Sequence, residues 1–224
     1  MYDKTIRVIL EGTVLQAKQI KRQQMLNAAR MLFTDNGFER TTMQKIADNA
    51  NVGVATLFRY FPKKELLIIE VVKEVIEEMV PQFEAIAHAS KSGYDKIEAI
   101  LDAYIQYIFS ANLQAVTLLE SFEYYMAYNP VEEKLLDEIR QSYTKIGRLI
   151  THSLQQGSSD GSITSQKATH LTIQTIMNVF GTAIKKHAFI SLLPDTIVPI
   201  PSKEELNELK FLILSYLKNK GDTM

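Results

Sequence analysis

The sequence predicts an all-α protein, because apolar residues recur at helical spacing along nearly all of its 224 residues. Alternating apolar and polar stretches bounded by turn residues, which would indicate strands, are missing from it. Segments rich in Gly, Pro, Ser and Asn divide the helical stretches, at 51–53, 90–93, 129–130, 157–161 and 193–201. We therefore expect a small three-helix domain followed by a larger helical bundle.

Three helices are expected in the first part of the chain, over 18–35, 41–50 and 54–61. Gly37 follows the first helix and is expected to end it in a left-handed conformation. Thr41 and Gln44 have the spacing of a capping box, so we expect Thr41 to cap the second helix. Pro62 closes the third helix.

The rest of the chain has the helical periodicity of a bundle. A long helix is expected to open at Lys63, Lys64 and Glu65 and to run toward Pro81, and further helices are expected at 82–90, 94–109, 112–127, 131–156, 166–190 and 203–219. The residues before the first strong helical pattern, 1–17, are expected to form a disordered arm rather than to add contacts to a binding partner through Lys4 and Arg7.

Composition excludes several classes of protein. Cysteine is absent, which rules out disulfides, thiolate metal sites and a cysteine nucleophile and is typical of a reducing cytoplasm. No apolar run reaches the roughly 20 residues that a membrane-spanning helix needs, and no export signal is visible. The four histidines form no ligand pair, and neither a phosphate loop nor a nucleophile elbow is present. We expect a cytoplasmic protein with no metal or cofactor that is not an enzyme.

Charge is distributed unevenly although the net charge is only −1. Residues 1–64 hold 11 of the 25 Lys and Arg but 5 of the 26 Asp and Glu, which gives them a net charge of +6 and leaves −7 for the rest. A basic end on an acidic body is the asymmetry expected when one segment meets a polyanion.

The basic end also contains a helix-turn-helix pattern, two short helices joined by a three- or four-residue turn. Its residues read GFERTTMQKIA from Gly37 to Ala47 and ANVGVATLFRYFPKKELL from Ala50 to Leu67. In order, spacing and residue type this segment closely resembles the amino-terminal module of the tetracycline-repressor (TetR) family. The resemblance implies a DNA-binding transcriptional regulator whose second short helix enters the major groove.

The family pattern implies which residues meet DNA. Those expected to face the groove or the backbone are Thr42, Val54, Ala55, Thr56, Arg59, Tyr60 and Lys64. Arg59 is the one bidentate donor among the groove-facing positions, so it is expected to read guanine or to hold a phosphate. Relatives commonly carry a small hydroxyl residue at Gly53, glycine at Ala55 and tyrosine at Phe58. These departures leave open a second hypothesis, a helical ligand-binding or scaffold protein that has lost operator binding.

The resemblance also implies that the larger domain binds a small effector and forms a homodimer. An apolar pocket with a few polar anchors suits the aromatic, Met and carboxylate residues of this part. The candidates for it are Tyr104, Tyr107, Glu120, Phe122, Glu123, Met126, Met177 and Phe180, although aromatic stripes at helical spacing are equally typical of core packing. Glu120 or Glu123 would then be the counter-charge of a flat or cationic molecule.

The last two long helices carry broad apolar surfaces and are the expected dimer interface. The expected organisation is an arm (1–17), a DNA-binding head (18–64) and an effector-binding and dimerisation body (65–224). The partners expected are a palindromic operator in double-stranded DNA, a second copy of the chain and an unidentified effector, with no membrane. The leading functional hypothesis is a repressor that the effector releases from its operator.

Overall fold

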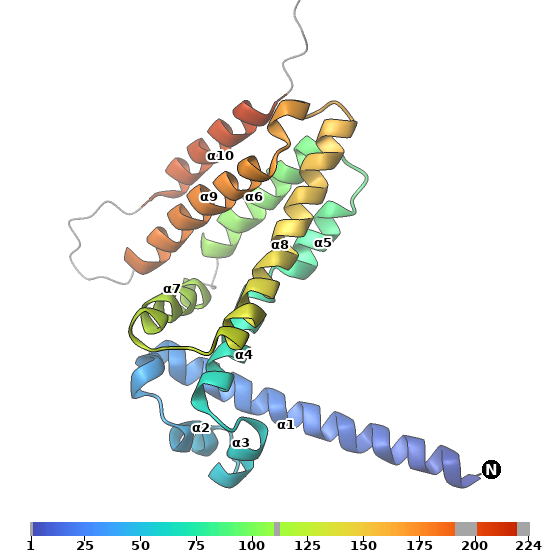
Figure 1. The fold of residues 1–224 in the computed structure, drawn as a ribbon, viewed down its shortest axis with the longest axis vertical. Coiled ribbons are helices and arrows are strands. Elements are labelled where there is room, and N and C mark those ends of the chain that lie inside the picture. The colour runs from blue at the N-terminus through green and yellow to red at the C-terminus, as the bar shows by residue number, and fades with distance from the viewer. Residues whose placement is uncertain (1, 110–112, 191–200, 219–224) are drawn as a thin grey trace, which may run out of the picture.

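The computed structural model describes residues 2–109, 113–190 and 201–218. They form the helices α1 (Tyr2–Arg40), α2 (Met43–Asn49), α3 (Val54–Tyr60), α4 (Lys64–Glu77), α5 (Val80–Ala87), α6 (Gly93–Phe109), α7 (Leu113–Tyr128), α8 (Glu133–Ser159), the short η1 (Ser165–Lys167), α9 (His170–Ile190) and α10 (Lys203–Leu217). No strand occurs within these ranges, so the expected all-α class is confirmed. Figure 1 shows the small group α1 to α3 attached to one end of a larger helical bundle.

Helix α1 is longer than its sequence pattern indicated, since it begins at Tyr2 instead of near Lys18. Residues 2–17, which were expected to form a disordered arm, are helical and continue α1 away from the bundle (Figure 1). The side chains of Lys4 and Arg7, weighed as DNA contacts, lie outside the described part of the chain. Gly37 has φ +75° and interrupts α1 as expected, but a further short helical stretch follows it up to Arg40.

The head folds around a compact apolar core shared by its three helices. Phe33 of α1, Ile46 of α2 and Leu57 of α3 are almost completely buried, and Phe61 closes the core after α3. Helices of seven residues are too short to be stable alone, so burial against α1 is what holds α2 and α3 in place. The head is therefore a rigid platform for whatever its outer face contacts.

The body is a bundle in which α4 and α8 lie next to each other and α6 packs between α8 and α10. Gly93 begins α6 at a point where α6 almost touches α8, and its amide donates to Asp160 Oδ2 at 2.9 Å. Hydrogen bonds from Ser162 and from the Gly93 amide hold the pKa of Asp160 below its ordinary value. This contact fixes the start of α6 on the end of α8.

Candidate nucleic-acid interface and ligand cavity

The start of α2 differs by one residue from the predicted capping box. Thr42, not Thr41, is the N-cap, and its Oγ1 accepts a hydrogen bond from the Lys45 amide at 3.2 Å. Thr41 is buried and donates its hydroxyl to the carbonyl oxygens of α1, and Gln44 donates forward to Asp48 Oδ1 at 2.8 Å. The expected pairing of Thr41 with Gln44 was wrong because α1 supplies acceptors for Thr41 that the local sequence does not reveal.

The turn between α2 and α3 is held by backbone geometry. Asn51 has φ +51°, the left-handed conformation that asparagine tolerates better than most residues, and the Val52 amide donates to Ala47 O at 2.9 Å. Gly53 then precedes α3 without a side-chain cap, and its carbonyl accepts from the Thr56 amide at 2.8 Å. Since Ala47 and Leu57 are both fully buried, the two helices keep a fixed angle.

Helix α3 buries Leu57 and turns its remaining residues outward to different degrees. Ala55, Phe58 and Arg59 are exposed, and the residues Val54, Thr56 and Tyr60 are half-buried. Phe58 is 45% exposed, which is unusual for a large apolar side chain on a folded surface. Among the described residues nothing bonds to Arg59, so its guanidinium is available to a partner outside the chain.

The two lysines at the start of α4 are engaged within the molecule. Lys64 Nζ donates to Phe38 O at 2.9 Å and to Thr41 O at 3.2 Å, so it binds the carbonyl end of α1. A cation is electrostatically favourable at that end of a helix. Lys63 forms an exposed ion pair with Glu132, 2.7 Å from Nζ to Oε1. The expected phosphate contact by Lys64 would require it to leave the carbonyls that it bonds.

The body contains a cavity of about 390 Å³ between α4, α6, α7, α8 and α9. Five of the eight expected effector residues line it, namely Tyr104, Tyr107, Glu123, Met177 and Phe180. Most of the remaining wall is aliphatic, contributed by residues such as Val75, Ile97, Ile100, Val116, Ile146 and Ile150. An apolar wall with few polar groups is the usual composition of a small-molecule site.

Three expected effector residues lie elsewhere on α7. Phe122 is buried against the head, with its ring centroid 6.2 Å from that of Phe38. Met126 packs on the apolar core, and neither it nor Glu120 belongs to the cavity wall. Burial raises the pKa of Glu120, and its Oε2 is buried without a hydrogen-bond partner among the described residues. These three side chains lie outside the cavity wall, and their assignment to an effector stays a prediction.

The sequence did not single out Tyr143 and Lys185, although both line the cavity. Burial raises the pKa of Tyr143 to about 12, which keeps its phenol protonated. Lys185 pairs with Glu123, 2.6 Å from Nζ to Oε1, at the polar part of the wall. Neither residue stands out from the helical pattern around it, and only the packing of α7, α8 and α9 identifies them.

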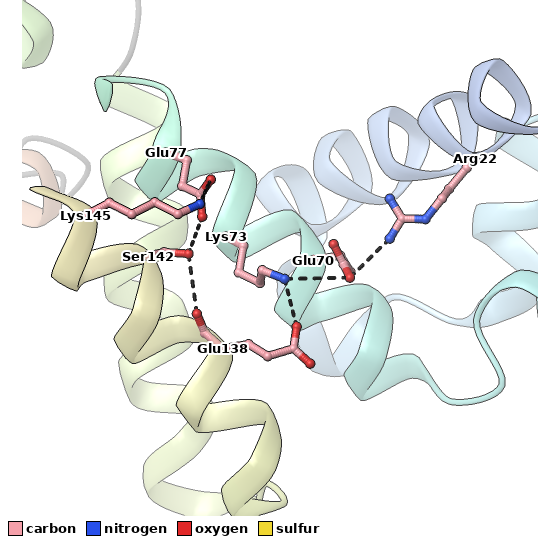
Figure 2. Close-up of polar contacts among 7 residues, drawn as sticks. All are labelled: Arg22, Glu70, Lys73, Glu77, Glu138, Ser142 and Lys145. Atoms are coloured by element: carbon pink, nitrogen blue, oxygen red, sulfur yellow. Dashed lines mark hydrogen bonds and ion pairs between the residues drawn. The ribbon is translucent and has the colours of Figure 1, made fainter. Parts of the chain in front are cut away.

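Polar side chains fix α4 between head and body. Figure 2 shows Glu70 and Lys73 of α4 linking Arg22 of α1 to Glu138 of α8, with 3.1 Å for Arg22 to Glu70 and 2.7 Å for Lys73 to Glu138. One turn further along α4, Glu77 accepts from Ser142 and Lys145 of α8. Burial opposes ionisation of Glu77, but these hydrogen bonds outweigh it and hold its pKa below the ordinary value.

The described ranges can be compared with the requirements of a metal site and of a membrane-spanning helix. No three His, Cys, Asp or Glu side chains gather there in a way that could hold a metal ion. No helix in those ranges is long and apolar enough to cross a membrane.

Comparison with known proteins agrees with the geometry of the head. Residues 25–71 match the model of the bacterial regulatory proteins of the tetR family. The transcriptional repressor KstR2 of Mycolicibacterium smegmatis is 24% identical over 151 residues, which are 63% of this chain and 67% of that protein. The fatty acid metabolism regulator protein of Bacillus subtilis is 25% identical over 145 residues, covering 64% and 73% of the two chains.

Solved structures share this fold over most of the chain. FadR from Bacillus halodurans, a fatty acid degradation regulator, has a TM-score of 0.67 at 17% identity and covers 88% of this chain and 100% of its own. FadR from Bacillus subtilis in complex with stearoyl-CoA has a TM-score of 0.63 at 19% identity, with 88% and 99% covered. The helix-turn-helix head, the matched family model and the curated relatives agree: residues 25–71 are the DNA-binding module of the tetR family of bacterial regulatory proteins, and the chain is similar to transcriptional regulators that carry this module.

Proposed function

We propose that the chain is a homodimeric repressor whose head (18–64) reads a palindromic operator and whose body (65–224) binds an effector that releases it. The observation that carries this proposal is the outer face of α3, where exposed side chains stand on a buried, rigid core. The residues that we assign to DNA are Thr42, Val54, Ala55, Thr56, Arg59 and Tyr60. We leave Lys64 out, because its ammonium group bonds two carbonyl oxygens of the head.

Arg59 is the main candidate for base recognition, since it is exposed and can donate to guanine O6 and N7 together. Phe58 lies beside it and offers apolar surface suited to a thymine methyl group. Thr42 caps α2 through its Oγ1, which leaves its hydroxyl hydrogen free to donate to a phosphate. Affinity would come from the basic head as a whole, and sequence preference from α3.

Helices α9 and α10 are the proposed dimer interface. They lie side by side along one outer side of the body (Figure 1), and their exposed apolar residues include Leu171, Val179, Phe211, Leu212 and Tyr216. Large apolar side chains gathered on one surface usually mark an interaction site. A two-fold pair would present two α3 helices to DNA half-sites, which in helix-turn-helix dimers are about 34–36 Å or a multiple apart.

The cavity supports an effector with an apolar body and one polar end. Its volume of about 390 Å³ falls within the range of small-molecule sites, and its wall is mostly aliphatic and aromatic. Glu123 is already neutralised by Lys185, so a cationic ligand, as the sequence suggested, is less favoured than an amphiphile. FadR of Bacillus subtilis, which shares the fold, was crystallised with stearoyl-CoA, and we propose a long-chain acyl compound as the effector class.

Operator binding can be tested by selecting bound sequences from random DNA duplexes with the full-length protein and measuring affinity by mobility shift. A palindromic consensus is expected, and Arg59→Ala should weaken its binding about tenfold by removing one bidentate contact. Arg148→Ala is the matched control, because Arg148 is an exposed arginine on α8 in the body. Failure to enrich any sequence, with equal binding by both variants, would favour a ligand-binding protein that has lost its operator.

The effector class has its own test. Stearoyl-CoA is expected to bind the wild-type protein and to weaken operator binding at micromolar concentration. Coenzyme A without the acyl chain is the control, since the cavity has little to offer its polar groups. If neither compound changes operator affinity, the acyl class is wrong while the DNA-binding proposal stands.

A further inference from the structure

One carboxylate joins the cavity wall to the head. Tyr107 of α6 lines the cavity, and its hydroxyl donates to Glu78 Oε2 at 2.6 Å. The other oxygen of Glu78 accepts from Nη1 of Arg30, which belongs to α1. Glu78 follows the last residue of α4 and does not itself line the cavity. A continuous polar chain therefore leads from a ligand-facing ring to the first helix of the head.

The side chains of Tyr107, Glu78 and Arg30 are suited to transmit a local change from the cavity to the head. The side chains of Arg30 and Glu78 are 32% and 28% exposed, so their ion pair is partly shielded from water. Burial and the hydrogen bond to Glu78 both raise the pKa of Tyr107, so the phenol stays a donor at neutral pH. A donor, a carboxylate and a guanidinium form charge-assisted hydrogen bonds, which are stronger and more dependent on geometry than neutral ones.

The ion pairs in Figure 2 differ in one respect from the contacts that join Tyr107, Glu78 and Arg30. They link α1, α4 and α8, but none of their seven residues lines the cavity. Glu123 and Lys185 do line it, but their pair joins α7 to α9 and does not reach the head. The route through Tyr107 and Glu78, in contrast, begins at the cavity wall and ends on α1.

We propose that Tyr107, Glu78 and Arg30 form a relay that reports effector occupancy to the head. The inference rests on the proposed function of the cavity and names the residues by which that site is regulated. An effector that takes the Tyr107 hydroxyl, or turns the ring, removes the donor from Glu78. Arg30 then loses part of what fixes α1 to the corner between α4 and α5, and the head can change its tilt. Such a ligand binds the two arrangements unequally, as allosteric release requires.

The sharpest variant is Tyr107→Phe, which keeps the ring in the cavity wall and removes the hydroxyl group that donates to Glu78. Tyr104→Phe is the matched control, because Tyr104 lies one turn away on α6, also lines the cavity, and makes no hydrogen bond among the described residues. Amide hydrogen exchange of the full-length protein, without DNA or ligand, should become faster in the second half of α1 for Tyr107→Phe and not for Tyr104→Phe. Equal exchange in the two variants would overturn the relay.

Operator affinity gives a second readout. Tyr107→Phe is expected to bind the operator about fivefold more weakly and to lose most of the response to stearoyl-CoA, when each protein is compared at a stearoyl-CoA concentration that saturates it in a direct binding titration. In an Arg30→Met background, Tyr107→Phe should have no further effect, since the relay is already broken. Additive effects of the two substitutions would contradict the relay.

The two proposals fail in different ways. A wild-type protein that ignores stearoyl-CoA contradicts the proposed effector class, and the exchange and double-mutant results still decide the relay. A Tyr107→Phe protein that matches wild type in exchange, operator affinity and response to stearoyl-CoA overturns the relay and leaves the proposed function intact.

Discussion

The contact between α6 and α8 allows a quantitative prediction from a single methyl group. At Gly93, an added Cβ would lie 2.1 Å from Gly157 N, 2.3 Å from Gly157 Cα and 2.4 Å from Ser153 O. All three atoms are backbone atoms of α8, so no side chain can rotate away from the methyl group. Gly93→Ala therefore has to push the start of α6 off α8.

The expected cost follows from overpacking. Extra atoms forced into a packed interior typically cost 1–3 kcal/mol, and because the backbone must move here we expect about 3 kcal/mol for Gly93→Ala. For a domain of this size each kcal/mol lowers Tm by roughly 2–4 °C, so a fall of about 6–12 °C is expected. Helix α6 carries Tyr104 and Tyr107, so the same displacement should also widen the cavity and weaken ligand binding.

Thermal unfolding by circular dichroism at one fixed protein concentration is the assay, because the Tm of a dimer depends on concentration. Gly181→Ala is the matched control. Gly181 lies inside α9 on the cavity wall, where an added Cβ meets nothing within 4 Å. It should leave Tm unchanged or raise it, since alanine favours helix by about 0.5–1 kcal/mol. A Gly93→Ala protein as stable as Gly181→Ala would refute the argument from close approach.

Three further predictions concern charge, assembly and the cavity. The pKa of Glu77 is lowered in the folded protein, so its stabilisation is present above the unfolded pKa of roughly 4.3 and is lost as pH falls through the folded value. Glu77→Gln should accordingly cost about 1 kcal/mol in urea unfolding at pH 7 and almost nothing near pH 3, and an equal loss at both pH values would contradict the ion-pair explanation. Leu212→Glu places a charge on the exposed face of α10 and should shift the molar mass in light scattering toward the monomer, whereas an unchanged dimer would place the interface elsewhere. Ile146→Phe reduces the free volume of the cavity and should weaken stearoyl-CoA binding at least tenfold without affecting operator affinity, and full binding would show that the ligand lies outside this cavity.

Helical periodicity was sufficient to predict most of the fold. The third helix was expected over 54–61 and is found at Val54–Tyr60, and the helix expected at 94–109 is found at Gly93–Phe109. Both are amphipathic helices bounded by Gly or Pro, for which local signals and tertiary packing agree. The early part of α1 was missed because residues 2–17 mix charged and apolar side chains without the regular apolar stripe that indicates an amphipathic helix.

The site was less predictable because it depends on contacts between distant residues. Thr41 and Thr42 are equivalent as caps in the sequence, and the choice between them is made by carbonyl oxygens of α1 that accept from Thr41. Lys64 was expected to contact a DNA phosphate. Its ammonium group instead donates to the carbonyl oxygens of Phe38 and Thr41, which lie more than twenty residues earlier in the chain and could not be identified from the local sequence. On α7, a helix covered on two sides has no single apolar stripe, so periodicity could not separate the cavity residue Glu123 from Phe122.

Helix α7 makes a second, apolar connection between the cavity and the head, through its two faces. One face contributes Val116 and Glu123 to the cavity wall, and the other packs Phe122 and Tyr125 against Phe38 at the end of α1. The burial of apolar surface between these rings is not directional and tolerates small shifts, whereas the hydrogen bonds through Glu78 depend closely on distance and angle. An effector that moves α7 and α6 by the same small amount should therefore break the contact at Glu78 before it separates Phe122 from Phe38. Loss of the hydrogen bond at Glu78 would then determine the effector-induced displacement at which the head is released. The packing of α7 on Phe38 would keep the head attached to the body while the head turns.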